Sequence, residues 1–373
     1  MAGIRAGNRW RWACAALLTV GAAAGCDGGD PAPSSPTGPA TSNAASAPAG
    51  KPDLDAGEQV AQGVDVPWGL AFLPGGDALI AERETGRVLR LALGGAAPRQ
   101  VHQVSGVAAG GEGGLLGLAV SPGFATDNLV YAYFTAERDN RIVRFRLDGG
   151  QPEVIFDGIA KAGFHNGGRI AFGPDGMLYV GTGDAGETDR SQDPASPNGK
   201  ILRLTPDGAP APGNPTAGSP VYSLGHRNVQ GLAWDSTGRL FATEFGQNEL
   251  DEVNRIEPGR NYGWPRVEGK GDTDGGRYTN PLVTWPVREA SPSGIAIAGD
   301  TAYVAALRGE RLWTVPLDGD RVGDPSAQLA ERYGRLRTVQ VAPDGALWVT
   351  TSNTDGRGDV REGDDRILRF PAR

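Results

Sequence analysis

The chain has 373 residues and a formal net charge of −8, with 36 Lys and Arg against 44 Asp and Glu. This acidic balance argues against nucleic acid as a partner, because a phosphate backbone is bound through clustered positive charge. The 58 glycines and 28 prolines favour many short strands joined by turns, and the sequence has no long helical periodicity.

Residues 1–25 have the pattern of a signal peptide. Three arginines precede an apolar run over residues 13–24, which is long enough for a signal-peptide core and short for a membrane span. Small residues then lead into Cys26, which resembles the lipobox of bacterial lipoproteins, although an alanine stands where leucine is more usual. We expect a lipid on Cys26 that anchors the protein to the membrane in the cell envelope. The alternative is ordinary cleavage and secretion. Cys14 leaves with the signal peptide, so no intrachain disulfide can form.

Residues 26–56 are predicted to be a tether. They are rich in Pro, Ser, Ala, Thr and Gly and have almost no large apolar side chain. Such a stretch cannot bury enough surface to fold. From residue 57 onward one pattern continues without a second linker, which predicts a single domain over residues 57–373.

Two short phrases recur six times in this domain. The first is an apolar pair, a tight turn and a β-rich run, with copies that begin at Ala71, Ala119, Ala171, Ala233, Ala296 and Val341. The second is a strand of alternating apolar and basic residues, with copies that begin at Gly86, Arg141, Lys200, Asp251, Arg311 and Arg366. Repeats spaced by about 50 residues indicate six like sheets. The prediction is an all-β fold, a six-bladed β-propeller.

One hairpin carries a candidate general base. His165 precedes the first strand of the third copy, and Asp184 follows its second strand. The two ends of a hairpin are neighbours, so these side chains should lie close together. A histidine that is oriented by a carboxylate is the minimum equipment of a general base near neutral pH. The alternative is that His165 caps a strand and Asp184 closes a turn.

Polar residues gather in the loops beside the repeats, and these loops converge on one mouth of a propeller. They include Arg227, Asn228, Arg308, Arg335 and Arg337. Arginines on loops of different blades indicate a polyanionic small ligand, because a guanidinium pairs with a carboxylate through two hydrogen bonds. Taken singly, each arginine is explained as well by a surface ion pair.

Calcium is the metal that these loops favour. Glycine-rich turns lie next to Glu249, Asp251 and Glu252, and the mature chain has few histidines and one cysteine. Carbonyl and carboxylate oxygens suit calcium, whereas zinc prefers cysteine and histidine.

Four loop motifs resemble those of the pyrroloquinoline quinone (PQQ)-dependent sugar dehydrogenases of the soluble glucose dehydrogenase and aldose sugar dehydrogenase family. They are G-E-G-G-L-L-G (111–117), H-N-G-G-R-I (165–170), G-H-R-N-V-Q-G-L-A-W (225–234) and N-Y-G-W-P (261–265). They occur in the family's order, and the resemblance extends from about Val66 to the C-terminus. It implies a PQQ- and calcium-dependent oxidoreductase that oxidises the C1 hydroxyl of aldose sugars to lactones and passes the electrons to an unidentified acceptor.

The resemblance also implies roles for single residues. His165 would take the proton of the C1 hydroxyl, and Asp184 would hold its imidazole. The residues implied at the cofactor are Arg227 and Asn228 beside the quinone oxygens, with Glu112, Arg308, Arg335 and Arg337 around it. The metal ligands implied are the carbonyls of Gly246 and Gln247 for calcium on the cofactor, and Glu252 with the Tyr262 carbonyl for a second, structural calcium. Trp285 is implied as a wall of the sugar pocket.

Three departures from the family pattern limit the specificity that can be expected. Arg308 stands where lysine is frequent, and Glu112 replaces a common glutamine, which places a carboxylate near an anionic cofactor unless it is protonated or turned away. Leu282 lies where the glucose enzyme has an aromatic residue, and the loops are short, so broad aldose activity is expected.

Two other functions stay open. One is a calcium-dependent lactonase, and the other is a non-catalytic surface binding propeller. The oligomeric state is expected to be a monomer or a homodimer.

Overall fold

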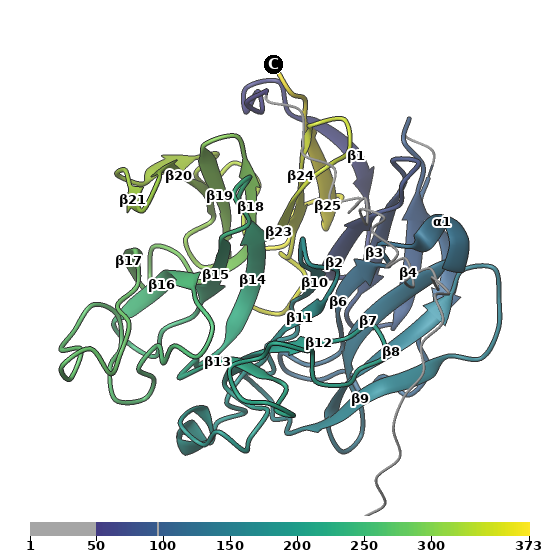
Figure 1. Ribbon diagram of the computed structural model, residues 1–373. Helices are drawn as coiled ribbons and strands as arrows, with labels where there is room; N and C mark the ends of the chain where they lie inside the picture. Colours follow the sequence, from purple (N-terminus) through teal and green to yellow (C-terminus); the bar gives the residue numbers. More distant parts are fainter. Residues whose placement is uncertain (1–49, 95–96) are drawn as a thin grey trace, which may run out of the picture. The chain divides into compact units, whose positions relative to one another are not determined.

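The computed structural model describes residues 50–94 and 97–373. The predicted signal peptide, Cys26 and most of the predicted tether lie outside the described residues. The strands of the described part form six antiparallel sheets (Figure 1). The prediction of an all-β, six-bladed propeller is therefore confirmed.

Five blades are built from strands that are consecutive in the chain. The first blade has β2 (Pro67–Phe72), β3 (Ala78–Glu82), β4 (Arg87–Leu91) and β5 (Arg99–Gln103). The second has β6 (Leu115–Val120), β7 (Leu129–Thr135), β8 (Asn140–Arg146) and β9 (Glu153–Ile159). The third has β10 (Ile170–Phe172), β11 (Leu178–Gly181), β12 (Lys200–Leu204) and β13 (Val221–Leu224). The fourth has β14 (Val229–Trp234), β15 (Leu240–Glu244), β16 (Leu250–Ile256) and β17 (Val283–Pro286). The fifth has β18 (Pro292–Ala298), β19 (Thr301–Ala306), β20 (Arg311–Asp318), β21 (Arg321–Val322) and β22 (Ser326–Gln328).

The sixth blade joins the two ends of the described chain. Its strands are β23 (Leu336–Val341), β24 (Leu347–Thr351), β25 (Arg366–Phe370) and, outermost, β1 (Glu58–Gln62). Beyond β1, Pro52 forms a bridge with Ala372, and the Asp53 amide donates to the Pro371 carbonyl. The paired chain thus begins inside the stretch that was predicted as tether, five residues before residue 57.

The first strands of the blades form a closed ring. β2 contacts β6, β6 contacts β10, and the series continues through β14, β18 and β23 back to β2. Each of the six hydrophobic clusters combines apolar side chains of neighbouring blades, two blades in five clusters and three in the cluster that includes Trp68. Burial of these apolar faces against one another is the main force that holds the blades together.

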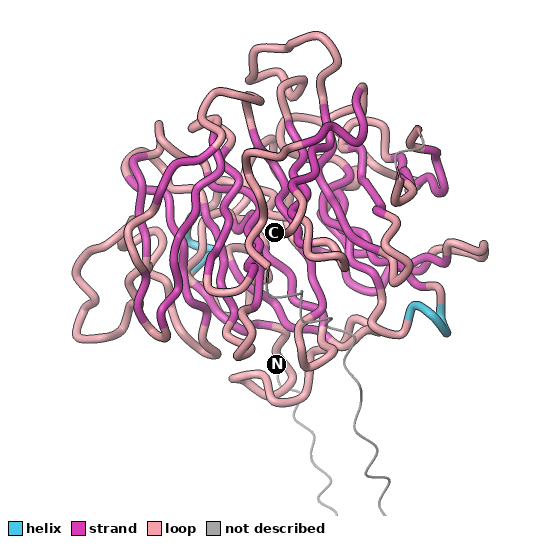
Figure 2. The backbone as a smooth tube through the Cα atoms, turned by 90° about the horizontal axis from the view of Figure 1, so that it is seen from above, coloured by secondary structure: helices cyan, strands magenta, loops and turns pink. Residues whose placement is uncertain are grey.

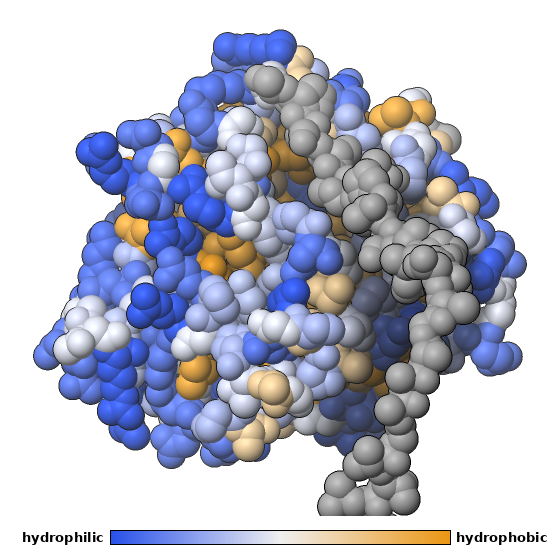
Figure 3. Space-filling view, in the orientation of Figure 1, coloured by the Kyte–Doolittle hydropathy of each residue, from blue (hydrophilic) through white to orange (hydrophobic). Residues whose placement is uncertain are grey.

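Strands and loops make up nearly all of the described chain, as Figure 2 shows. Among the described residues, helical structure is limited to α1 (Phe124–Asp127) and to one 3-10 turn over Thr188–Ser191. No helix in residues 50–94 or 97–373 is both long and apolar enough to cross a membrane. The face shown in Figure 3 is mostly hydrophilic, and apolar side chains appear on it only in small separate areas.

Candidate active site

One mouth of the ring is a cavity built by side chains from most of the blades. Its lining residues are Trp68, Arg83, Glu112, Gln230, Phe245, Leu307, Arg337, Asp355 and Arg357. They come from loops and strand ends of the first, second, fourth, fifth and sixth blades. The third blade contributes His165, whose amide donates a hydrogen bond of 2.9 Å to Oε2 of the lining residue Glu112.

The structure brings His165 and Asp184 together, as the hairpin predicted. Nδ1 of His165 lies 2.7 Å from Oδ1 of Asp184, which is fully buried. The Gly186 amide also donates to Oδ1 at 2.8 Å, and the indole of Trp264 donates to Oδ2 at 2.9 Å. Burial alone would raise the pKa of Asp184, but the hydrogen bonds and the neighbouring imidazole outweigh it and lower that pKa.

This arrangement fixes the proton on the imidazole ring. Because Asp184 is ionised, it can only accept, so the hydrogen sits on Nδ1 of His165 and the lone pair on Nε2. The backbone of His165 has φ +54, in the left-handed region that a residue with a Cβ seldom adopts. The hydrogen bond from its amide to Glu112 helps to hold that conformation.

Glu112 is neither protonated nor turned away. Burial would raise its pKa, but an ion pair with Arg357 and the hydrogen bond from His165 lower it. Oε1 of Glu112 lies 2.9 Å from Nη1 of Arg357. A carboxylate therefore stands at the mouth with its charge compensated from the sixth blade.

Arg227 and Asn228 lie just before β14, next to the pair of His165 and Asp184. The Arg227 guanidinium donates to Oε1 of Gln247 and to the Phe245 carbonyl, and it lies 5.5 Å from the ring of Trp264. Oδ1 of Asn228 accepts the Gly167 amide at 3.0 Å. Nδ2 of Asn228 is buried and has no hydrogen-bond partner in the described part of the chain.

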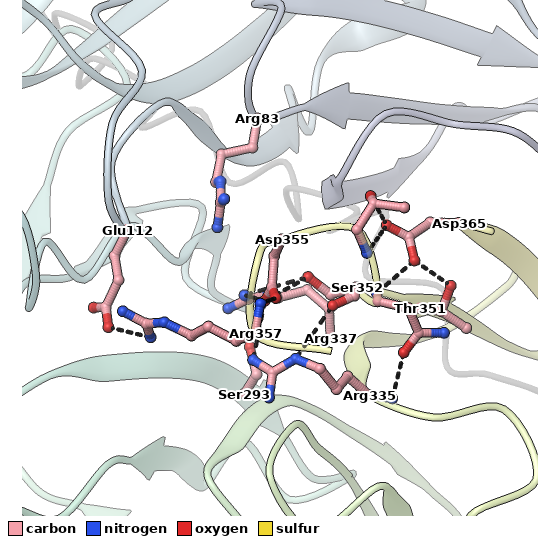
Figure 4. A network of polar contacts seen from close by, with 12 residues as sticks. Arg83, Glu112, Ser293, Arg335, Arg337, Thr351, Ser352, Asp355, Arg357 and Asp365 are labelled. Carbon is pink, nitrogen blue, oxygen red and sulfur yellow. Dashed lines mark hydrogen bonds and ion pairs between the residues drawn. The ribbon is translucent and has the colours of Figure 1, made fainter. Parts of the chain in front are cut away.

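Arg335 and Arg337 share one carboxylate at the start of the last blade (Figure 4). Nη2 of Arg335 lies 3.0 Å from Oδ2 of Asp355, and Nη2 of Arg337 lies 3.3 Å from the same oxygen. Burial lowers the pKa of Arg337 to about 9, although Asp355 opposes the shift. Nε of Arg337 is buried without a partner among the described residues. The pair therefore has more donors than its own acceptors satisfy.

A further cation, Arg169, lies beneath the mouth and pairs with no carboxylate of residues 50–94 or 97–373. The buried Arg169 donates to the Gln230 carbonyl at 2.7 Å and to Oγ1 of Thr338 at 3.0 Å, and its guanidinium lies 4.2 Å from the ring centre of Trp68. The mouth and the channel below it therefore carry an excess of positive charge, although the whole chain is acidic.

Two of the predicted site residues are not part of this constellation. Arg308 is exposed and does not line the cavity, although its neighbour Leu307 does. Trp285 was expected at the sugar pocket, but it lies on β17, is 4% exposed, and stacks on Trp313 at 5.4 Å in the core between the fourth and fifth blades. Its ring packs against apolar side chains of this core, and its role at the sugar pocket stays a prediction.

The predicted calcium loop follows β15. One carboxylate oxygen of Glu268 accepts the amides of Gln247, Asn248, Glu249 and Leu250 at 2.7–3.2 Å. Since these four amides point at Glu268, the loop is held in one conformation. No group in the described part of the chain donates a hydrogen bond to the carbonyl oxygens of Gly246 and Gln247.

Glu252 lies in a buried polar cluster close to Tyr262. Its carboxylate accepts from the Gly269 amide and from Nδ2 of Asn254, which are both neutral groups. Burial, with Glu244 nearby, raises the pKa of Glu252. Oδ1 of Asn254 is buried without a donor among the described residues. The Tyr262 ring stacks at 4.8 Å on His226, whose Nδ1 lies 2.8 Å from Glu244.

Sequence reasoning missed several residues of the site. They are Trp68, Arg83, Arg169, Trp264, Glu268, Asp355 and Arg357. Trp264 and Arg169 stand in the motifs that were recognised, so the motifs could have pointed to them. Glu268, Asp355 and Arg357 have no local pattern that marks them.

The fold and the site define a class of protein. A six-bladed propeller places an oriented histidine at a cationic mouth, which is an arrangement suited to an anionic cofactor and to proton abstraction from a substrate. The family model for glucose/sorbosone dehydrogenases matches residues 64–368. The chain belongs to this family, and the resemblance seen in the sequence is confirmed.

Solved structures and characterised relatives agree with this identification. The PQQ-bound form of the aldose sugar dehydrogenase from Streptomyces coelicolor is 54% identical with a TM-score of 0.82, and the match covers 87% of this chain and 100% of that chain. The aldose sugar dehydrogenase YliI of Escherichia coli (strain K12) is 28% identical over 79% of this chain and 89% of its own length. Quinoprotein glucose dehydrogenase B of Acinetobacter calcoaceticus is 30% identical over 62% of this chain and 57% of its own length.

Proposed function

We propose that this chain is a PQQ-dependent oxidoreductase that oxidises the C1 hydroxyl of aldose sugars to lactones. The observation that carries the proposal is the pair of His165 and Asp184, 2.7 Å apart, at a mouth rich in arginine. When bound, PQQ would supply a quinone as the two-electron oxidant for this reaction.

The residues of the mouth fit an anionic quinone. Arg337 Nε and Asn228 Nδ2 are buried donors that lack a partner in the described part of the chain, and burying such a donor unpaired is costly. Arg335 and Arg337 would hold carboxylates of the cofactor, and Arg227 with Asn228 would donate to its quinone oxygens.

The loop after β15 and the cluster of Glu252 fit calcium. Gly246 and Gln247 present carbonyl oxygens that accept nothing within the described residues, and these would hold a calcium ion on the cofactor. Glu252, the free Oδ1 of Asn254 and the Tyr262 carbonyl would hold a structural calcium. Burial, with Glu244 nearby, raises the pKa of Glu252, and a calcium ion at this site would oppose that shift.

The chain's own residues handle the proton. Nε2 of His165 carries the lone pair and would accept the proton of the C1 hydroxyl, while the ionised Asp184 would stabilise the imidazolium that forms. The guanidinium of Arg227 would stabilise negative charge on the quinone oxygens of the cofactor. Removal of the hydroxyl proton and of the C1 hydrogen leaves a carbonyl at C1, which in a cyclic sugar is a lactone.

One experiment separates this proposal from the two rival functions. The purified protein is titrated with PQQ and calcium, and reduction of an artificial acceptor dye is measured with a panel of aldoses. Dye reduction by several aldoses supports the proposal. Consumption of lactones without PQQ would indicate the lactonase, and ligand binding without any turnover would indicate a binding propeller.

The lipid anchor remains part of the proposal. A lipid on Cys26 would keep the domain in the cell envelope, and Cys26→Ser would release it from the membrane fraction. Equal membrane content of both proteins would contradict the anchor.

A further inference from the structure

A long-range ion pair crosses the mouth. Nη1 of Arg357, in the loop after β24, lies 2.9 Å from Oε1 of Glu112, in the loop before β6, and the two residues are 245 positions apart. Figure 4 shows the Arg357 side chain extended toward Glu112. These loops belong to the sixth and second blades, which are not neighbours in the ring, so the pair spans the mouth in front of the first blade.

Glu112 connects this ion pair to the catalytic histidine. While Oε1 receives Arg357, Oε2 accepts the backbone amide of His165 at 2.9 Å. His165 has a left-handed backbone, which is costly for a residue with a Cβ and needs support from its surroundings. An ionised acceptor gives a stronger hydrogen bond than a neutral one, so the charge on Glu112 contributes to that support.

Arg357 is the cation that directly compensates Glu112. The other charged groups that face this carboxylate are His165, Arg83, Arg227, Arg337 and Asp355. Arg83 donates to Glu84, Arg227 to Gln247, and Arg337 shares Asp355 with Arg335. Without Arg357, a carboxylate whose side chain is 18% exposed would face the mouth with no contacting cation among the described residues.

We propose that Arg357 is a charge-balancing residue that lets this mouth accept an anionic cofactor while Glu112 holds the backbone of His165. The inference rests on the proposed function, because the cofactor that is affected is PQQ. It explains how the chain tolerates a glutamate at a position where a neutral amide would cause no repulsion. Glu112 and Arg357 thus act as one functional unit.

A double-mutant cycle on PQQ affinity tests the proposal. We expect Arg357→Gln to weaken PQQ binding about tenfold, a coupling of about 1.4 kcal/mol, because Glu112 then repels the cofactor. Glu112→Gln alone should bind PQQ at least as tightly as wild type. Glu112→Gln combined with Arg357→Gln should restore affinity to within about twofold of wild type.

The pH dependence of PQQ affinity is an independent test of the proposal. In Arg357→Gln, a falling pH protonates Glu112 and removes the repulsion, so the deficit in affinity should shrink as the pH is lowered. In the double variant no carboxylate remains at position 112, so its affinity relative to wild type should not recover in this way. All other groups that face Glu112 are common to both variants and cancel in this comparison.

Arg146→Gln is the matched control. Arg146 is exposed and pairs with Asp148. It lies at one end of β8, and Asn140, which contacts Asn166 beside His165, lies at the other end. It removes the same single charge away from the mouth, and PQQ affinity should stay unchanged. The melting temperature of each variant, measured without PQQ, checks that the variant folds.

Three outcomes would overturn the inference. If Arg357→Gln binds PQQ like wild type, Arg357 does not balance Glu112. If the single Arg357 variant and the double variant are equally weak, Arg357 contacts the cofactor itself. If wild type fails to bind PQQ, the proposed function fails first and the inference with it.

Discussion

At the scale of one residue, the buried carboxylate of Asp184 determines which nitrogen of the His165 imidazole carries the hydrogen. The protein hides this carboxylate completely and supplies three donors to it, from His165, Gly186 and Trp264. Its lowered pKa has a direct consequence for the imidazole, because an ionised acceptor keeps the proton on Nδ1 and leaves Nε2 free. In the proposed mechanism, the orientation of the His165 imidazole would therefore depend on the groups that hold Asp184.

His165→Ala should separate catalysis from cofactor binding. We expect turnover to fall by about 10²- to 10⁴-fold, which is the usual contribution of a positioned general base. PQQ affinity should stay close to wild type, because the proposed cofactor contacts lie on other blades. Dye reduction at saturating aldose and a PQQ titration measure the two effects.

Asp184→Asn serves as the intermediate case. The amide leaves the imidazole in place but removes the charge that orients it, so turnover should lie between those of wild type and His165→Ala. If both variants lose stability while turnover per folded molecule is unchanged, His165 and Asp184 only cap the hairpin.

Trp264→Phe tests the hydrogen bond that the Trp264 indole donates to Asp184. It keeps an aromatic ring near Arg227 but deletes the hydrogen bond of 2.9 Å to Oδ2. Hydrogen bonds to charged groups contribute about 1.5–3 kcal/mol, and two donors remain, so we expect a loss of about tenfold in kcat. The acid limb of the pH–rate profile should move to higher pH, because a carboxylate with one donor fewer attracts the imidazolium more strongly.

Trp285→Phe is the control for this variant. The indole nitrogen of Trp285 is buried without a partner among the described residues, and the ring packs in the core. The substitution deletes no hydrogen bond, so kcat and the pH profile should remain those of wild type. A change of aldose preference in Trp285→Phe would instead return this residue to the sugar pocket.

At the scale of elements, the sequence predicted the inner strands well and the outer strands poorly. The first phrase corresponds to the two inner strands of each blade, and the second phrase corresponds to the third strand. Inner strands such as β3 and β19 are buried at every position, so their apolar runs are readable. Outer strands such as β5 and β21 have no buried residue, so they carry no apolar pattern.

The calcium loop is an element whose conformation could not be read from the sequence. Four consecutive amides turn toward Glu268, which lies about 20 residues downstream. The glycine and the nearby carboxylates indicated calcium, but the carboxylate that shapes the loop lies outside the motif. The motif therefore predicted the ligand chemistry of the loop, but it did not predict that Glu268 holds the loop in its conformation.

Calcium removal should destabilise the protein through Glu252. We expect a chelator to lower the melting temperature and calcium to restore it, because a ligand at 100 times its Kd stabilises the native state by about 2.7 kcal/mol. Glu252→Gln should abolish this response. Without calcium it should melt at or above wild type, because burial and Glu244 raise the pKa of Glu252, and glutamine removes the carboxyl group whose ionisation they disfavour.

Glu249→Gln is the matched control for the calcium experiment. Glu249 is exposed beside the same loop, so its variant should respond to chelator and calcium as wild type does. Zinc should not replace calcium in either protein. A melting temperature that ignores both chelator and calcium would contradict the proposed ligands.

At the scale of the whole molecule, the site exists only when the ring is closed. Trp264 reaches Asp184 across 80 residues, and Arg357 reaches Glu112 across 245. Such contacts have no local signature, which is why the motifs located the mouth but not its ion pairs. The blade that closes the ring takes its outermost strand, β1, from the other end of the domain.

Truncation tests this closure. A chain that begins at Gly50 should melt like the full-length protein in one transition, because all of the described pairing remains. A chain that begins at Gly63 loses β1, its ladder with β25, the burial of Ala61 and the ion pair of Glu58 with Arg369. We expect its melting temperature to fall by roughly 5–10 °C, since each kcal/mol lost shifts a large domain by about 2 °C. The exposed edge of β25 should also promote aggregation. If both chains melt together and stay soluble, β1 does not close the ring.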